Sequence, residues 1–165
     1  MDVYTLAYRH PLGVITAGFT ERGLCEIDLG GQPPETPADP PTRQVNAWAT
    51  RLIRALDRYF AGNEEDFRDI PLDWDGATPF RRAVWETARG VGWGEPSSYG
   101  DLARRMGRTT GCSRAVGQAL GANPVPIVVP CHRFLAGDGT IGGFTGGLGW
   151  KRAFEGGRER RGVLL

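Results

Sequence analysis

Residues 98–121 read SYGDLARRMGRTTGCSRAVGQALG, and this stretch decides the fold class of the second half of the chain. Ser98 and Asp101 form a variant capping box that opens a helix, and Gly107 is typical of a residue that stops one. After a short turn, Ser113 is expected to cap a second helix. Two short helices across a tight glycine-containing turn predict a helix-turn-helix, although an ordinary helical hairpin is the commoner arrangement.

The second helix has a composition that suits close approach to another surface. Small residues leave its surface shallow: Ala115, Gly117, Ala119, Gly121 and Ala122. Such residues lower helix stability but let the backbone come near a partner, and Arg114 stands beside them. A major-groove reader is expected to carry several long polar side chains. The pattern therefore favours a shallow or narrow groove, and with it DNA binding that is independent of base sequence.

The first part of the chain predicts a scaffold. Strands are expected over residues 3–8, 13–19 and 24–29, separated by turn sequences, and a linker rich in Pro and Gly follows over 30–42. Apolar residues then recur at three- and four-residue spacing from Val45 to Tyr59. This spacing predicts one long amphipathic helix that covers the sheet. In the third strand, Cys25 shares a face with Ile27 and Leu29, which predicts a core position for Cys25.

A second lobe is expected to begin near residue 74. Thr78 can cap a helix that carries Pro79 in its first turn and ends at Gly90. The predicted fold class is an α/β N-terminal lobe with an antiparallel sheet (residues 1–73) plus a mostly α C-terminal lobe with a winged-helix-like helix-turn-helix (residues 74–165).

Charge is divided unevenly between the two halves of the 165 residues. Residues 1–76 carry 7 Arg and 13 acidic residues, a net charge of −6, whereas residues 77–165 carry 13 basic and 6 acidic residues, a net charge of +7. An arginine-rich half suggests a polyanionic partner such as nucleic acid. Solvated surface charge is an equally good explanation of the charge taken alone.

The three cysteines and the hydropathy of the chain argue against several classes of protein. Three is an odd number, and none of the cysteines forms a Cys-x-x-Cys pair, which argues against a disulfide scaffold and a zinc knuckle. No stretch has the apolar length of a membrane span. We therefore expect a soluble, cytoplasmic protein that holds no metal and contacts no membrane.

The tetrapeptide Pro130-Cys131-His132-Arg133 is a candidate nucleophilic site. It closes an apolar run and places a thiol beside an imidazole and a guanidinium, groups that favour the reactive thiolate. The chain has only two histidines, so an imidazole partner must be His132 or His10. An arbitrary Cys after an apolar run is more often a small core residue, but its neighbours here favour a nucleophile. Glycines downstream are consistent with a pocket wall or with a surface loop.

Residues 123–133, preceded by Arg114-Ala115-Val116-Gly117, resemble the signature of the O6-alkylguanine-DNA alkyltransferases, also called methylated-DNA-protein-cysteine methyltransferases. The resemblance extends over about residues 74–152, and the first 73 residues match only in general layout. It implies DNA repair in which an alkyl group moves from O6 of guanine, or O4 of thymine, to Cys131 after base flipping. It also implies one turnover per molecule, no cofactor, a monomer, and double-stranded DNA with an alkylated guanine as partner.

The resemblance also assigns roles to individual residues. His132 would take the Cys131 proton through a water, Tyr99 would help to rotate the nucleotide and offer its hydroxyl to the guanine ring, and Asn123 would fix the hinge before the nucleophile. Arg114 would fill the vacated stack. The implied DNA contacts are Arg114, Ser113, Ala115 and Tyr99; the implied pocket residues are Phe134, Phe144, Thr145 and Gly146, with the Thr145 amide facing O6.

Three departures from the family pattern stand out. Phe144 occupies a position where Tyr is usual, so one pocket hydroxyl is missing. The glutamate that would orient His132 is out of register, because Arg158 stands at its position and Glu159 is the first substitute. The N-terminal zinc ligands of some members are also absent.

Other functions remain open at the level of sequence. A non-catalytic sensor of alkylated DNA that recruits other repair factors is the principal alternative, as in relatives without the cysteine. A cysteine hydrolase and a winged-helix regulator are the others.

Overall fold

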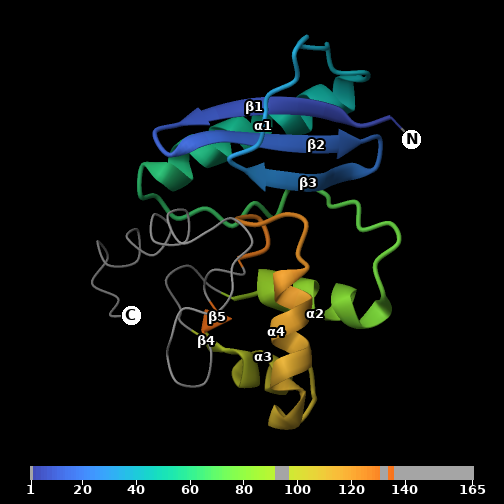
Figure 1. Cartoon of the computed structure of the whole chain (residues 1–165), viewed down its shortest axis with the longest axis vertical. Helices are drawn as coiled ribbons and strands as arrows, with labels where there is room; N and C mark the ends of the chain where they lie inside the picture. Colours follow the sequence, from blue (N-terminus) through green and yellow to red (C-terminus); the bar gives the residue numbers. More distant parts are fainter. Residues whose placement is uncertain (1, 92–96, 131–133, 136–165) are drawn as a thin grey trace. The chain divides into compact units, whose positions relative to one another are not determined.

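The structure is a computed structural model, and it describes residues 2–91, 97–130 and 134–135. The chain divides into two compact units, Met1–Asp75 and Gly76–Leu165. Figure 1 traces both, with an antiparallel sheet in the first unit and helices in the second. This is the α/β lobe and helical lobe that the sequence predicted.

A three-stranded meander forms the sheet of the first unit. The strands β1 (Tyr4–His10), β2 (Gly13–Thr20) and β3 (Gly23–Leu29) pair antiparallel in the order β1-β2-β3 (Figure 1). In the central strand β2, every residue from Ile15 to Thr20 is buried. Ile15, Ala17 and Phe19 are fully buried on one face of the strand, and the alternate positions hold Thr16, Gly18 and Thr20, which are buried as well.

Helix α1 (Arg43–Phe60) covers one face of this sheet (Figure 1). Thr42 caps it, because the Thr42 side chain accepts a hydrogen bond from the Val45 N–H at 3.1 Å. The predicted apolar stripe lies on the buried face, although Trp48, one of its members, is only half-buried. The buried residues of α1 are Val45, Ala49, Leu52, Ala55, Leu56 and Tyr59. Each fully buried Leu stabilises the fold by roughly 1.5–3 kcal/mol.

The structure corrects the core position predicted for Cys25. The register of β2 and β3 shifts at Gly18/Phe19, so Leu24 pairs with Phe19 and is fully buried, while Cys25 is only half-buried. A bulge adds one residue to one strand and breaks the two-residue alternation on which the prediction relied. Burial, followed by the charges of Glu26 and Asp73, raises the pKa of the Cys25 thiol to about 11. Cys25 is therefore a poor thiolate source.

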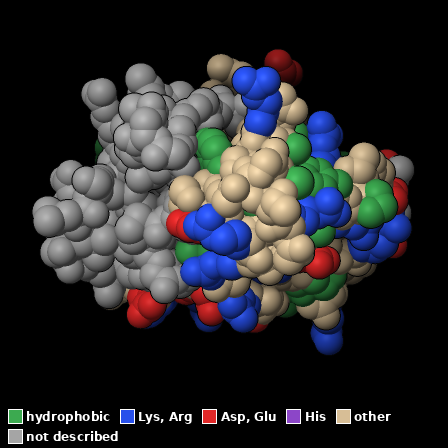
Figure 2. Space-filling model, turned by 90° about the horizontal axis from the view of Figure 1, so that it is seen from below, with side chains coloured by type: hydrophobic (Ala, Val, Ile, Leu, Met, Phe, Trp, Pro, Cys, Tyr) green, Lys and Arg blue, Asp and Glu red, His purple; other side chains and the backbone are tan. Residues whose placement is uncertain are grey.

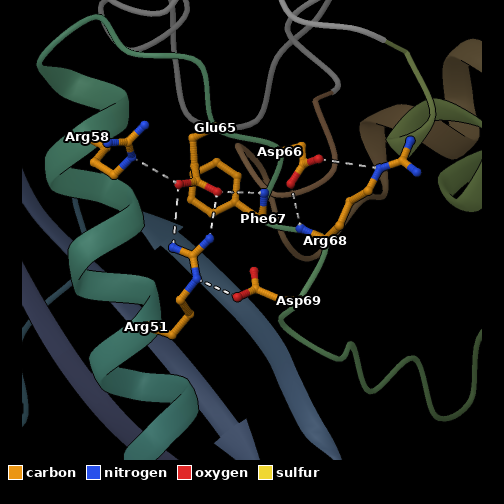
Figure 3. A network of polar contacts seen from close by, with 7 residues as sticks. All are labelled: Arg51, Arg58, Glu65, Asp66, Phe67, Arg68 and Asp69. Atoms are coloured by element: carbon orange, nitrogen blue, oxygen red, sulfur yellow. Dashed lines mark hydrogen bonds and ion pairs between the residues drawn. The ribbon is translucent and has the colours of Figure 1, made fainter.

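A polar network holds the chain that follows α1 (Figure 3). The buried Glu65 carboxylate lies 2.8 Å from Arg51 Nη2 and 3.6 Å from Arg58 Nε, and it accepts the Phe67 N–H at 3.2 Å. Arg51 also reaches Asp69 at 2.5 Å. Phe67 has φ = 57°, in the left-handed region, and its ring is buried. Together these contacts hold the strained backbone of Phe67 in place, and they bring residues 65–70 against the helix.

Three α-helices make up most of the described part of the second unit. They are α2 (Pro79–Arg89), α3 (Tyr99–Arg105) and α4 (Ser113–Gly121), and a 3₁₀ turn, η1 (Thr110–Cys112), precedes α4. As predicted, Thr78 caps α2, since its hydroxyl accepts the Arg81 N–H at 3.2 Å. The helices pack on one another, and Trp85 Nε1 of α2 donates to the Ala119 carbonyl of α4 at 2.8 Å. The pair α3 and α4 forms the expected helix-turn-helix.

The capping role predicted for Ser113 is wrong. Cys112 is the N-cap residue of α4 and makes no side-chain capping bond, while Ser113 is already helical. The Ser113 hydroxyl instead donates to the Thr110 carbonyl at 2.5 Å. Because the 3₁₀ turn already brings helical backbone geometry to the start of α4, the serine lies one residue too far along to cap it.

Candidate functional site

The start of α3 fixes the position of Tyr99. The strand β4 (Ser97–Ser98) runs directly into this helix, and the predicted capping box is confirmed. Ser98 Oγ accepts the Asp101 N–H at 3.0 Å, and the Asp101 carboxylate accepts the Ser98 N–H at 3.1 Å. These hydrogen bonds from Ser98, together with the ion pair to Arg104, hold the pKa of Asp101 below its usual range. Tyr99 is thus the first residue of a capped, well-defined helix.

The Tyr99 ring lies against α4 at Gly117. A Cβ added to Gly117 would be only 3.0 Å from ring atoms Cδ2 and Cε2, so a glycine is what allows this contact. The sequence placed Gly117 and Ala119 on the shallow outer surface. The structure instead turns Gly117 toward Tyr99 and buries Ala119 in the helical core. The small residues of α4 therefore serve internal packing as well as its outer face.

The outer face of α4 carries the expected DNA-contact residues. Arg114 and Ala115 are exposed, as are Gln118 and Gly121 further along the helix, and Ser113 is half-buried. Sequence reasoning passed over Gln118, although its spacing of four residues from Arg114 places both on one side of the helix. The face combines one cation, one amide and two small residues.

Asn123 ties together the loop that leads to the candidate nucleophile. It is 6% exposed, its Nδ2 donates to the Val129 carbonyl at 3.1 Å, and its Oδ1 accepts the Val125 N–H at 3.0 Å. The Val129 N–H in turn donates to the Val125 carbonyl at 3.0 Å. Ile127, within this loop, has φ = 74°, which a β-branched residue adopts only when its surroundings enforce it. All residues from Val125 to Pro130 are buried.

The chain that follows the candidate nucleophile is fixed by a short sheet. Strand β5 (Phe134–Leu135) pairs in parallel with β4, with Ser97 opposite Phe134. Phe134, an implied pocket residue, is fully buried. Because β4 continues into Tyr99, the structure brings the segment that follows residues 131–133 to the start of α3. The remaining predicted site residues lie outside the described residues: Cys131, His132, Phe144, Thr145, Gly146 and Glu159.

His10, the other histidine, has contacts of its own in the first unit. Its Nδ1 accepts the Leu12 N–H at 3.1 Å in the turn between β1 and β2, and its ring centroid lies 4.3 Å from that of Phe60. Burial lowers the pKa of His10. These contacts give the residue a structural part in the hairpin.

Positive charge gathers on the described surface of the second unit. Figure 2, which views the molecule from below the view of Figure 1, shows blue Arg side chains with some red Asp and Glu side chains between them. The exposed arginines among the described residues of this unit are Arg81, Arg82, Arg104, Arg105, Arg108 and Arg114. Its described acidic residues are Glu86 and Asp101, and Asp101 is paired with Arg104. The described part of the unit therefore presents a net positive surface, which suits a polyanion.

The described ranges contain neither a metal-ligating cluster nor a membrane-spanning helix. No group of three or more His, Cys, Asp or Glu side chains there could hold a metal ion. None of the helices in those ranges has the length and apolar character to cross a membrane.

Both units match known protein families. Residues 3–74 match the family described as "6-O-methylguanine DNA methyltransferase, ribonuclease-like domain". Residues 79–155 match "6-O-methylguanine DNA methyltransferase, DNA binding domain".

Relatives and solved structures agree with these matches. A methylated-DNA–protein-cysteine methyltransferase of Haemophilus influenzae is 48% identical over 59% of this chain, and the match spans only 54% of that relative. A DNA base-flipping protein of Thermus thermophilus is 44% identical over 67% of this chain and 75% of its own length. The crystal structure of Mycobacterium tuberculosis O6-methylguanine methyltransferase is 32% identical, with a TM-score of 0.79, and covers 97% of this chain and 94% of its own. A structure of the mycobacterial protein in complex with DNA has 34% identity and a TM-score of 0.75, over 93% of this chain and 92% of its own.

Proposed function

The chain belongs to the 6-O-methylguanine DNA methyltransferase family, and from this we propose that it repairs DNA by moving an alkyl group from O6 of guanine to its own Cys131. The observation that carries the proposal is the pair of fixed segments on either side of Cys131. Asn123 ties the loop before it, and β5 ties the chain after it to the start of α3. A nucleophile that must meet one carbon atom in line needs such a rigid setting.

Residues 74–165 would bind the DNA and carry out the transfer, while residues 1–73 would act as a scaffold. The exposed face of α4, with Arg114 and Ala115, would lie in the minor groove, where small residues permit close approach. The crystal structure of the mycobacterial relative in complex with DNA supports a DNA partner. Contacts to the backbone and the groove shape would make binding independent of base sequence.

The alkylated guanine would leave the base stack before it reacts. Its O6 substituent is inaccessible inside a duplex, so the nucleotide must rotate outward, which costs a few kcal/mol, roughly. Arg114 would occupy the vacated space in the stack. Tyr99, held at the first position of α3, would help to rotate the backbone.

The chemical step would be a single displacement at carbon. His132 would accept the Cys131 proton through a water, with Glu159 as the candidate to orient the imidazole, and the thiolate would attack the alkyl carbon. The S–C bond forms as the C–O6 bond breaks, and the electron pair stays on the guanine. Tyr99 would donate a hydrogen bond to the guanine ring and stabilise that negative charge. Because water does not hydrolyse a thioether, each molecule would act once, with no cofactor.

The base pocket, a second candidate substrate and the cellular state of the protein complete the picture. Phe134, Phe144, Thr145 and Gly146 would line the base pocket, and O4-alkylthymine is a second candidate substrate. The protein would act as a cytoplasmic monomer.

A non-catalytic sensor of alkylated DNA is the second candidate. The 44% identity to the Thermus protein named as a DNA base-flipping protein favours it. The retained Cys131 favours transfer, because a sensor needs no nucleophile.

Intact mass spectrometry separates the two functions. The protein is mixed with duplex DNA that carries one O6-methylguanine, followed by peptide mapping, with Cys131→Ala as the control. Transfer predicts one added methyl group per molecule, on Cys131, and none on the variant. Lesion-selective binding without any gain in mass would establish the sensor and overturn the transfer.

A further inference from the structure

Arg108, in the turn between α3 and α4, has a fixed backbone. The Gly107 N–H donates to the Arg104 carbonyl and the Arg108 N–H to the Ala103 carbonyl, both at 2.9 Å. Gly107 has φ = 74°. This is the Schellman arrangement, in which a left-handed glycine ends a helix and the next residue bonds back across the last turn. The direction in which the Arg108 side chain leaves the turn is thereby set.

The Arg108 side chain is also held, by an aromatic ring of another helix. Its guanidinium carbon lies 5.2 Å from the centroid of the Phe80 ring, in the first turn of α2. This is a cation–π contact, and Arg108 nevertheless remains exposed. A guanidinium over a ring keeps its in-plane N–H donors available for a further partner.

The charge around this contact is uncompensated among the described residues. Arg81, next to Phe80 in the chain, is exposed as well, and neither Arg81 nor Arg108 forms an ion pair within those ranges. Of the described acidic residues of the unit, Asp101 is engaged by Arg104, and Glu86 lies six positions beyond Phe80 along α2, about 9 Å by helical rise. Arg108 thus holds an uncompensated charge over the Phe80 ring, and Arg81 carries a second one at the next residue of α2.

We propose that Arg108 and Arg81 form a phosphate-binding clamp for the DNA backbone, outside the groove-facing surface of α4, and that Phe80 preorganises Arg108 for it. The proposal rests on the proposed function, since it presumes a DNA substrate. A planar guanidinium matches two phosphate oxygens, and a side chain already held in place loses less conformational freedom on binding. Phe80 is a positioning residue, whereas Arg108 touches the DNA.

The test compares Arg108→Gln with Arg54→Gln, an exposed arginine of α1 whose charge loss is the same. Binding to a duplex with one O6-methylguanine is measured over a range of salt concentrations in the Cys131→Ala background. Alkyl transfer from the free base O6-benzylguanine, which has no phosphate, is measured with Cys131 present. We expect Arg108→Gln to weaken duplex binding roughly tenfold and to reduce the slope of log K against log salt by about 0.9. Free-base transfer should stay unchanged.

Phe80→Leu tests the preorganisation. It keeps the charge of Arg108 and most of the apolar volume but removes the ring. We expect it to weaken duplex binding on its own and to add nothing in the Arg108→Gln background, because both changes disable the same contact. Additive effects of the two changes would overturn the role of Phe80.

Several outcomes would overturn the clamp. One is an Arg108→Gln protein that binds duplex DNA with the affinity and salt slope of Arg54→Gln. Another is a lower melting temperature with unchanged binding, which would make the contact purely structural. If the wild-type protein neither binds the duplex nor gains mass from it, the proposed function fails and the clamp fails with it. If the wild-type protein transfers the alkyl group from the duplex and Arg108→Gln leaves duplex binding unchanged, only the clamp is overturned and the proposed function stands.

Discussion

At the scale of single residues, Asn123 holds the loop that precedes Cys131, the proposed alkyl acceptor. Its amide satisfies two buried backbone groups at once, the Val129 carbonyl and the Val125 N–H. Neither group can reach water, because both residues are buried. The amide is thus the link between the end of α4 and the buried turn before Cys131.

We expect Asn123→Ala to destabilise the protein by about 2–4 kcal/mol, since two buried backbone groups lose their partners. Alkyl transfer should slow as well, because the loop before Cys131 loses its tie. Urea unfolding and single-turnover transfer to the protein measure the two effects. Asn46→Ala, at an exposed position of α1, is the control and should change stability by no more than about 0.5 kcal/mol. Equal stability of the two variants would show that Asn123 does not hold the loop.

Three local expectations from the sequence succeed, whereas the cap predicted at Ser113 fails because a 3₁₀ turn precedes α4. Thr78, Ser98 and Asp101 were recognised as helix-capping residues because their partners lie three positions away. Cys25 was misplaced because strand alternation cannot reveal a bulge in the partner pairing.

At the scale of elements, α3 depends on its capping box, and Asp101 makes that dependence a function of pH. Its folded-state pKa is held low by the Ser98 backbone and side chain. A carboxyl group with a lowered folded pKa adds stability above its unfolded value of about 3.9 and loses that contribution as the pH falls through the folded value.

We therefore expect the wild-type protein to melt at a higher temperature than Asp101→Asn near pH 7, and the difference to shrink as the pH is lowered to 3. Asparagine keeps an acceptor for the Ser98 N–H but cannot titrate. Thermal melts of both proteins across this range measure the difference, and titration of other groups, such as Asp73, cancels in it. A difference in melting temperature that stays constant with pH would mean that the Asp101 charge does not stabilise the helix.

The contacts between elements are the part that the sequence did not reveal. Helices α1, α2 and α3 were predicted from apolar spacing and capping residues, which are local properties. The contact of Tyr99 with Gly117 joins α3 to α4, and the contact of Phe80 with Arg108 joins α2 to the turn after α3. No periodicity encodes such pairs, because they depend on how α2, α3 and α4 pack together.

At the scale of the whole molecule, the opposite charges of the two halves should decide which part meets DNA. The first half carries a net charge of −6 and the second +7. A polyanion is repelled by one and attracted by the other, so the charge division would steer DNA toward the half that contains Cys131. A total net charge of +1 hides this arrangement.

Duplex binding by the wild-type protein should therefore weaken steeply with salt, by a factor of about ten or more between 50 and 200 mM if several arginines contact phosphates. Transfer from O6-benzylguanine should depend little on salt, because the free base carries no phosphate. Titrations with duplexes of different sequence should give the same slope, since backbone contacts carry no base information. Tight duplex binding that persists at high salt would contradict a backbone-dominated interface and would point to apolar or base-specific contacts instead.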